Sequence, residues 1–221
     1  MVLNDIDLHI LPGEYVGIVG KSGCGKSTLM RLLLGFEKPI SGGIFYDQYD
    51  LAKIDKTSLR RKIGCCLQSG SLFTGDIFHN ITITAPWSTH EDAWEALRMS
   101  SMEEDVRRMP MGLHTVVSEG GGGFSGGQKQ RILIARALIS RPDIIFFDEA
   151  TSALDNISQK QVSDNLDQLA CTRVIIAHRL STIRHCDRII VLDKGKIAEE
   201  GNFEELMEKK GLFYEMSLRQ L

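Results

Sequence analysis

The residues with the clearest chemical meaning in this sequence lie between Gly20 and Thr28, where the chain reads G-K-S-G-C-G-K-S-T. This segment fits the pattern G-x-x-x-x-G-K-[ST] of a phosphate-binding loop. Its glycines let the backbone turn successive N–H groups towards phosphate oxygens. Lys26 can reach the β- and γ-phosphates, and the Ser27 hydroxyl can ligate Mg²⁺. The segment therefore predicts a site for a nucleoside triphosphate with Mg²⁺.

The segments on either side of this loop are the elements that must position it. Tyr15–Val19 is a short apolar run that predicts a buried strand, and Leu29–Leu34 has the composition of a helix that stops at Gly35. A helix that starts at the loop adds its positive dipole end to the phosphate site. A glycine-rich turn without a ligand is the alternative, but it does not account for the complete motif in this context. The expected nucleotide-binding residues of the loop are Gly20, Lys21, Ser22, Gly23, Cys24, Gly25, Lys26, Ser27 and Thr28.

A second pair of reactive residues follows a later apolar run. Ile144–Phe147 predicts a fully buried strand, and Asp148 and Glu149 stand at its carboxyl end. In a phosphate-loop ATPase the first acid holds the magnesium shell, and the second can polarise the attacking water as a general base. An exposed acidic turn is the other interpretation of such a pair. The intact phosphate loop earlier in the chain favours the catalytic one.

These motifs occur in one order with several others, and together they resemble the nucleotide-binding domain of ATP-binding cassette (ABC) proteins over residues 1–221. The discriminating part is Ser-Gly-Gly-Gln, because unrelated ATPases share the phosphate loop and the acidic strand. The resemblance implies an α/β fold: a P-loop NTPase core with a mostly parallel sheet, an antiparallel β subdomain that is incomplete at its N-terminal side, and an α-helical subdomain inserted at about residues 70–140. The motifs that carry it are the phosphate loop, Gln68, Phe124–Gln128, Asp148–Glu149, Ser152–Asp155 and His178.

The resemblance also implies roles for individual residues. Gln68 would act in catalysis by reaching Mg²⁺ or the attacking water, and His178 would contact the γ-phosphate of ATP and orient Glu149. Without that context, His178 would be interpreted as a hydrogen-bonded structural histidine. The expected ligands of Mg²⁺ are Ser27, Gln68 and Asp148, and the expected catalytic residues are Glu149, His178 and Gln68.

The signature segment implies a partner. In the family, Ser125, Gly126, Gly127 and Gln128 cap the nucleotide bound to the phosphate loop of a second copy, with a helix N-terminus pointing at it. Two ATP molecules would then be enclosed in a head-to-tail dimer with two-fold symmetry, and Asp155 would lie at its interface. A monomer is expected to bind ATP but to hydrolyse it poorly.

The sequence around the signature is similar to that of exporters. Thr115–Gly120 resembles the exporter segment that relays closure to a transmembrane domain, and Met109–Gly122 is similar to transporters of the nitrile-hydratase-leader-peptide bacteriocin type, which export ribosomally made peptides. Phe124 stands where leucine is usual, at a packing position. The family's adenine-stacking aromatic precedes Val2 and is not contained in the sequence, so weakened adenine binding is expected.

Composition sets further bounds. With 221 residues and a net charge of −3, the chain gives no electrostatic reason to expect nucleic acid as a partner. No apolar run approaches the roughly 20 residues that cross a bilayer, so a partner chain or another part of the same polypeptide is expected to supply the transmembrane domain. We expect the isolated domain to be soluble and to work at the cytoplasmic face of the cell membrane.

The rest of the chain gives simpler expectations. Val2–Ile10 alternates like a strand, Gln130–Ile139 predicts a helix, and Asp187–Leu192 with Lys196–Glu200 predicts a hairpin. Two short helices are expected to turn Ala93, Leu97 and Val106 towards a core. The five cysteines lack disulfide or metal spacing and suggest reduced thiols, of which Cys24 is placed so that alkylation would block nucleotide binding.

Two other functions are compatible with parts of the pattern. One is an ABC ATPase that works on DNA or the ribosome rather than in transport, but the long coiled-coil insertion or the second cassette that such proteins carry is not in the sequence. The other is a monomeric fragment that binds ATP without hydrolysing it. The main prediction is an ATPase domain that powers an exporter.

Overall fold

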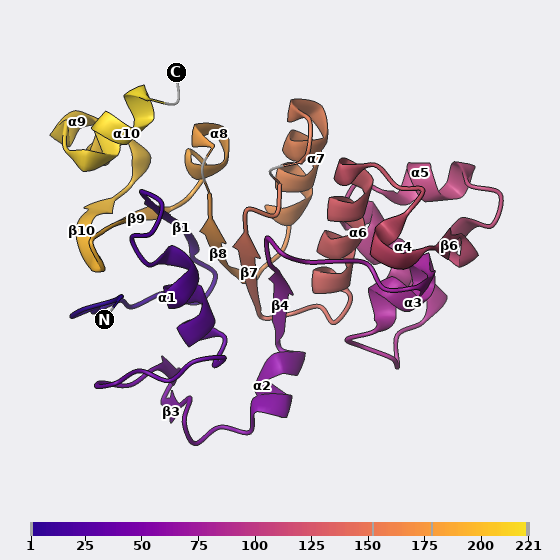
Figure 1. Ribbon diagram of the computed structural model, residues 1–221, viewed down its shortest axis with the longest axis horizontal. Helices are drawn as coiled ribbons and strands as arrows, with labels where there is room; N and C mark the ends of the chain where they lie inside the picture. The colour runs from indigo at the N-terminus through magenta and orange to yellow at the C-terminus, as the bar shows by residue number, and fades with distance from the viewer. Residues whose placement is uncertain (1, 152, 178, 220–221) are drawn as a thin grey trace. The chain divides into compact units, whose positions relative to one another are not determined.

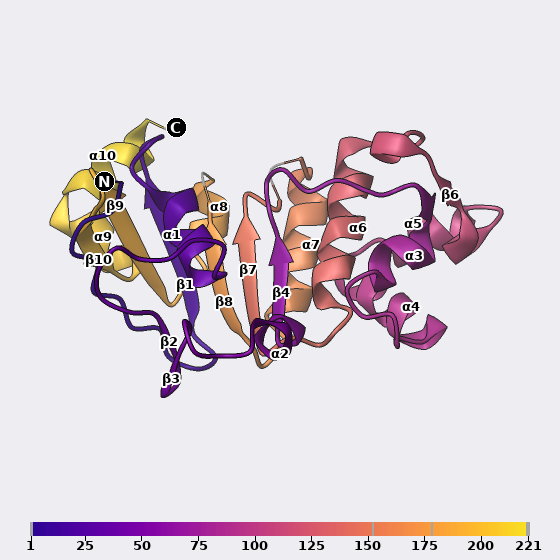
Figure 2. The same ribbon diagram turned by 60° about the horizontal axis from the view of Figure 1, so that its bottom comes forward.

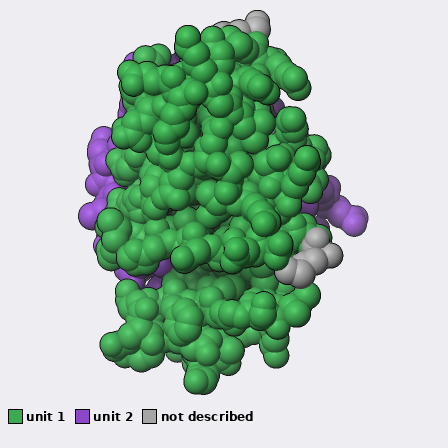
Figure 3. Space-filling view, turned by 90° about the vertical axis from the view of Figure 1, so that its left-hand side faces the viewer, with its two compact units in different colours: residues 1–59, 172–221 green, residues 60–171 purple. Residues whose placement is uncertain are grey.

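The computed structural model describes residues 2–151, 153–177 and 179–219, and it divides into two compact units. Unit 1 comprises Met1–Leu59 with Thr172–Leu221, and unit 2 comprises Arg60–Cys171. Figure 3 colours unit 1 green and unit 2 purple. Two residues of the sequence motifs, Ser152 and His178, lie outside the described residues.

Unit 1 is built on a sheet in which three strands are parallel. The strand order is β10-β9-β1-β8, with β1 (Tyr15–Gly20) parallel to both β8 (Thr172–Ile176) and β9 (Arg188–Asp193). All six residues of β1 are buried, which is what a parallel strand covered on both faces requires. The predicted hairpin is confirmed: β10 (Lys196–Gly201) pairs with β9 in the antiparallel sense.

The helices of unit 1 are short, and α1, labelled in Figure 1, is the first helix after β1 and begins after the loop of residues 21–25. The predicted helix after the phosphate loop is confirmed as α1 (Lys26–Leu33), and a small antiparallel hairpin follows it. The remaining elements up to the unit boundary and at the C-terminal side are β2 (Phe45–Tyr46), β3 (Tyr49–Asp50), α2 (Lys56–Arg61), α8 (Leu180–Ile183), α9 (Phe203–Lys209) and α10 (Leu212–Leu218).

The prediction of a strand over Val2–Ile10 is wrong. The side chains do alternate between half-buried and exposed, as the sequence pattern indicates. However, Asp5 adopts a left-handed backbone with φ of 56°, which interrupts an extended run. The Asn4 N–H donates to the carbonyl of Gly195 at 2.8 Å, and no regular ladder forms in this described segment.

Unit 2 contains one pair of parallel strands among its described residues. β4 (Ile63–Cys66) pairs with β7 (Ile144–Asp148), with Cys65 opposite Phe146. Figure 2 shows the two strands side by side, both ending at the same edge. Gln68 follows β4 by two residues, and Asp148 is the last residue of β7. The parallel register therefore delivers two of the predicted functional segments to one edge of this strand pair.

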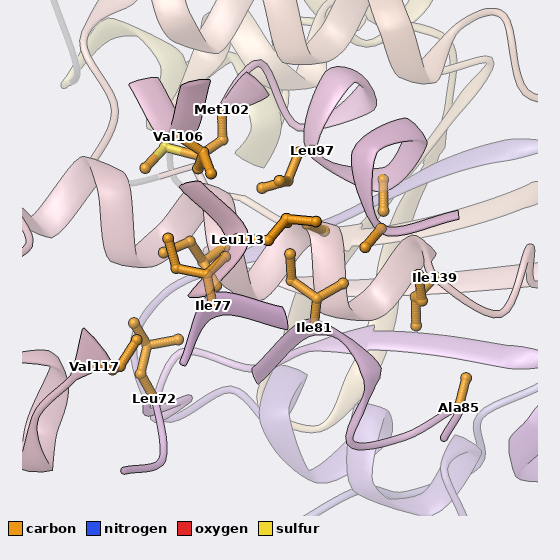
Figure 4. Close-up of a cluster of buried hydrophobic side chains, with 14 residues drawn as sticks. Leu72, Ile77, Ile81, Ala85, Leu97, Met102, Val106, Leu113, Val117 and Ile139 are labelled. Atoms are coloured by element: carbon orange, nitrogen blue, oxygen red, sulfur yellow. The ribbon is translucent and has the colours of Figure 1, made fainter. Parts of the chain in front are cut away.

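The rest of unit 2 is mostly helical. Its core contains residues from α3, α4, α5 and α6, including Ile81, Leu97 and Ile132, none of which has exposed surface (Figure 4). Ala93 and Val106 are also buried in it, as predicted. The elements are β5 (Gly75–Asp76), α3 (Ile77–Thr82), α4 (His90–Met99), α5 (Glu103–Arg108), η1 (Gly112–His114), β6 (Val116–Val117), η2 (Glu119–Gly121), α6 (Gly126–Leu138) and α7 (Asn156–Leu166).

Helix α6 runs through the centre of this unit. It contacts β4, α3 and α4, and it starts four residues before the expected Gln130, because Ser125 caps it. Phe124, just before the cap, is partly buried against the helical core, so an aromatic residue is accommodated there. Within the described residues, no helix is long and apolar enough to cross a membrane.

The five cysteines are all free thiols. Cys66 is buried on β4, and burial raises its pKa from 9.0 to about 12, with a further contribution from the neighbouring Cys65. Burial also raises the pKa of Cys65 to about 12, and the charge of Asp148 adds to this effect. Both thiols therefore stay neutral in the folded chain at physiological pH.

The helical core yields a stability prediction. Ile81→Ala removes buried methylene groups from a close-packed site, so it should lower the free energy of unfolding by about 2–5 kcal/mol in urea denaturation. Ile157→Ala is the matched control, because that isoleucine is 74% exposed and its replacement should change the free energy by no more than about 0.5 kcal/mol. Equal effects of the two substitutions would contradict the assigned core.

The buried thiols yield a pH prediction. In the unfolded chain thiols ionise near pH 8.5–9, whereas Cys66 stays protonated in the folded chain up to about pH 12. Its contribution to stability is complete below the unfolded pKa and is lost as pH rises towards the folded pKa, at about 1.4 kcal/mol per pH unit. Under reducing conditions, the free energy of unfolding should fall less steeply between pH 9 and pH 10.5 in Cys66→Ala than in the wild type. The same dependence of the free energy of unfolding on pH in both proteins would contradict the raised pKa of Cys66.

Candidate nucleotide-binding and catalytic site

The phosphate loop adopts a backbone that only glycine supports at key positions. Gly25, the N-cap of α1, has φ of 111°, and Gly20 has φ of 153°. A Cβ at Gly20 would lie 2.3 Å from the Leu192 carbonyl oxygen and 2.6 Å from Cys24 Sγ. No side chain caps the N-terminus of α1. These features fit an anion such as phosphate, which backbone N–H groups and the helix dipole bind.

Lys26 and Ser27 open helix α1 with different surroundings. The Lys26 side chain is buried, and its Nζ donates to the carbonyl oxygens of Gly20 at 2.7 Å and Lys21 at 3.2 Å. The ammonium group is therefore held within the loop by its own backbone. Ser27 is exposed, so its hydroxyl is accessible to a ligand. Cys24 is buried, with Sγ 4.0 Å from Lys26 Nζ, so alkylation there requires the loop to open.

The acidic pair of unit 2 is placed with Gln68. Asp148 is buried at the end of β7, and Glu149, the next residue, is half-buried with a left-handed backbone of φ 53°. The Gln68 Nε2 donates to the Glu149 Oε2 at 3.0 Å. The structure thus brings together two predicted catalytic residues that are 81 positions apart in the sequence.

The signature segment forms the first turn of α6. The Ser125 hydroxyl accepts from the Gln128 N–H at 3.2 Å, and the Gln128 side-chain oxygen accepts from the Ser125 N–H at 3.0 Å. This reciprocal capping box satisfies two donors and leaves the other N-terminal N–H groups of the helix for another partner. Ser125 and Gly126 are exposed, and Gly127 is half-buried. The segment therefore lies at the surface of the described structure, and the Ser125–Gln128 hydrogen bonds fix its backbone conformation.

Asp155 occupies a local structural position. It caps helix α7, and its carboxylate accepts from the N–H groups of Ile157 at 3.0 Å and Ser158 at 2.9 Å. The hydrogen bonds from Ser158 hold the pKa of this carboxyl below its usual range. A charged carboxylate at a helix N-terminus also matches the helix dipole. Asp155 thus fixes the start of α7 in this structure.

One residue of the site is not identified by the motifs. Gln130, in the second turn of α6, donates from Nε2 to the Glu149 carbonyl oxygen at 3.1 Å, and its Oε1 accepts from the Ala153 N–H at 2.8 Å. The sequence signal for it is weak, because Gln130 is one of four consecutive polar residues, Gln128–Arg131, and nothing in the pattern sets it apart from its neighbours. Only the fold shows that this side chain reaches the backbone of the acidic pair.

The donor set suits magnesium bound with a nucleotide. Mg²⁺ is commonly held by one or two carboxylates together with phosphate oxygens and water, rather than by a cage of protein ligands. Asp148, in unit 2, offers a buried carboxylate, and Ser27, in unit 1, offers an exposed hydroxyl; each by itself is an oxygen donor of the hard type that Mg²⁺ prefers. The residues present therefore fit the group that the sequence predicts.

Comparison with known proteins supports this interpretation. The family model for the ABC transporter matches residues 3–152. The alpha-hemolysin translocation ATP-binding protein HlyB of Escherichia coli O157:H7 is 46% identical over 216 residues, which are 97% of this chain and 31% of that protein. The exotoxin translocation ATP-binding protein PaxB of Pasteurella aerogenes is 46% identical over 223 residues, which are 100% of this chain and 31% of that protein. The chain thus spans about a third of the length of these relatives.

A solved structure of a bacterial Atm1-family ABC exporter with ATP bound is also similar, with a TM-score of 0.96 and 39% sequence identity over 99% of this chain and 39% of that one. The match confirms the predicted fold class, a mixed α/β domain with a mostly parallel sheet. The chain therefore belongs to the ABC transporter family, and its similarity is to the ATP-binding part of exporters.

Proposed function

We propose that this chain is the ATP-binding and ATP-hydrolysing domain of an ABC exporter. The observation that supports this most is the hydrogen bond from Gln68 to the Glu149 carboxylate, beside the buried Asp148. This arrangement presents a carboxylate that can accept a proton, with an amide fixed next to it. Together with the complete phosphate loop and signature, it fits hydrolysis better than nucleotide binding alone.

In the proposed reaction, each site residue that the structure describes has its own role. The loop from Gly20 to Thr28 holds the phosphates, with Lys26 supplying positive charge to the β- and γ-phosphates. Ser27, Gln68 and Asp148, the predicted ligands, would hold Mg²⁺, which would neutralise the charge that develops on the phosphate oxygens. A water oxygen attacks the γ-phosphorus, the bond to the β,γ-bridging oxygen breaks, and ADP and phosphate form. Glu149 takes the proton from that water, and Gln68 orients the carboxylate.

The proposed assembly is a head-to-tail dimer joined to a transmembrane domain. Ser125 and Gly126 are exposed at the N-terminus of α6, where they can bind a nucleotide held by a second copy. ATP binding would favour the closed dimer and hydrolysis would reopen it, which is a ligand-driven shift between two states. His178 would contact the γ-phosphate, as the family resemblance implies. The site of action would be the cytoplasmic face of the cell membrane.

The proposed cargo is a polypeptide. The sequence resemblance suggests a bacteriocin-type peptide, whereas the relatives are named for the translocation of alpha-hemolysin and of an exotoxin. Export of polypeptides is a cargo class that includes both kinds of substrate, and export of bacteriocin-type peptides is the narrower hypothesis. The same relatives favour transport over a soluble ABC ATPase that acts on DNA or the ribosome.

Lys26→Ala should abolish most nucleotide binding. Removing the ammonium group takes away the positive charge that the loop supplies to the phosphates, so the dissociation constant for Mg-ATP in calorimetric titration should rise at least about tenfold, equivalent to about 1.4 kcal/mol. Lys53→Ala, at an exposed lysine outside the motifs, is the control and should bind as the wild type does. Unchanged affinity in a Lys26→Ala chain with a wild-type melting temperature would contradict the assignment.

Glu149→Gln should separate binding from hydrolysis. The substituted amide oxygen can still accept from Gln68 but cannot take the proton from water, so turnover should fall by about 10²–10⁴-fold. Binding of Mg-ATP should persist, and the variant should elute as a dimer in size-exclusion chromatography with ATP. Turnover equal to the wild type would show that Glu149 is not the general base. A wild-type chain that binds ATP but neither dimerises nor turns it over would support the inert-fragment alternative.

A further inference from the structure

The side chain of Gln130 joins two backbone positions on the segment that follows β7. Its Nε2 donates to the Glu149 carbonyl oxygen at 3.1 Å, and its Oε1 accepts from the Ala153 N–H at 2.8 Å. The two partners fix the orientation of the amide, because a carbonyl can only accept and an N–H can only donate. Both ends of one amide are therefore used, and the geometry requires glutamine rather than glutamate.

The Glu149 backbone is in a conformation that needs support. Its φ of 53° is left-handed, a region that is unfavourable for any residue other than glycine. Such conformations persist where the surroundings hold them, and they cluster at active sites. The carbonyl that Gln130 holds belongs to this same residue. The orientation of this carbonyl group is tied to the backbone conformation of Glu149. That conformation sets the direction in which the side chain leaves the Cα, and so the position of the carboxylate that Gln68 contacts.

Ala153 is also a neighbour of the signature. A Cβ at Gly127 would lie 3.4 Å from the Ala153 carbonyl oxygen, and a Cβ at Gly126 would lie 3.7 Å from the Ala153 Cβ. Gln130 is one helical turn beyond these glycines on α6. The same short stretch of helix therefore leaves little room between its signature glycines and Ala153, and it binds Ala153 and Glu149 through the Gln130 amide.

We propose that Gln130 is a positioning residue for hydrolysis, which holds the backbone of Glu149 in its reactive orientation and links it to the signature helix. The proposal rests on the proposed function, in which Glu149 is the general base. Gln130 itself does not contact the reacting atoms. Because the signature is expected to bind the nucleotide of a second copy, a shift of α6 would reach Glu149 of its own chain through this amide.

Two substitutions at Gln130 distinguish this role from a structural one. In Gln130→Met the hydrogen bonds to Glu149 and Ala153 are lost, while the side chain keeps nearly the same length. In Gln130→Glu one carboxylate oxygen still accepts from the Ala153 N–H, but the donor to the Glu149 carbonyl is lost. Gln168→Glu is the matched control, because Gln168 is exposed and no side-chain hydrogen bond is found for it in the described structure.

The experiment measures steady-state hydrolysis of Mg-ATP by the 221-residue chain at high protein concentration, with thermal unfolding of each variant. We expect kcat to fall about 10- to 100-fold in both Gln130 variants, since small misplacements of catalytic groups have effects of this size. The KM for ATP should stay within about twofold of the wild type, and Gln168→Glu should match the wild type in both constants.

The outcomes separate the two levels of the proposal. Wild-type kcat in Gln130→Glu, with a loss only in Gln130→Met, would overturn the positioning role, because the Ala153 bond alone would then suffice. A rise in KM without a fall in kcat would also overturn it. Failure of the proposed function has a different signature: the wild type would not hydrolyse ATP, or Glu149→Gln would hydrolyse it as fast as the wild type.

Discussion

The left-handed backbone of Glu149 is the constraint on which the proposed catalytic site of this structure depends. It occurs directly after a buried parallel strand, so the chain must leave the sheet edge and turn the carboxylate at once. A local conformation of this kind is not favourable by itself. Two glutamines from different elements hold it: Gln68 binds the carboxylate and Gln130 binds the carbonyl. The Glu149 carboxylate, the proposed general base, is thus positioned by the fold rather than by its own sequence neighbours.

Helix α6 carries most of that support. Its first turn is the capped signature, its second turn holds Glu149, and Arg136, near its end, donates to the carbonyl oxygens of Asn80 at 2.7 Å and Ser71 at 3.0 Å. Ser71 lies three residues after Gln68, so the helix also contacts the segment that follows Gln68, the residue that binds the Glu149 carboxylate. A rigid helix with these contacts can transmit a displacement of the signature to both glutamines.

The sequence predicted best where a pattern repeats locally. The apolar run of β1, the hairpin of β9 and β10, and the phosphate loop follow from neighbours in the chain, and so does the buried face of Leu97. The segment Val2–Ile10 alternates convincingly, yet Asp5 turns left-handed and no ladder forms, because pairing depends on a partner strand that a pattern does not contain. Gln130 was missed for the same reason: its partners lie 19 and 23 positions away, and only the packing of α6 brings them within reach.

The central claim, that α6 acts on hydrolysis through Glu149, is tested most directly by a double-mutant cycle on single-turnover hydrolysis. If Gln130 acts only by positioning that carboxylate, Gln130→Met should have no further effect in a Glu149→Gln background, because the group it positions is already inactive. Rates of the single Glu149→Gln variant and the double variant should then be equal. An additional loss in the double variant, as large as the loss that Gln130→Met causes in the wild type, would show that the two residues act independently and would contradict the account.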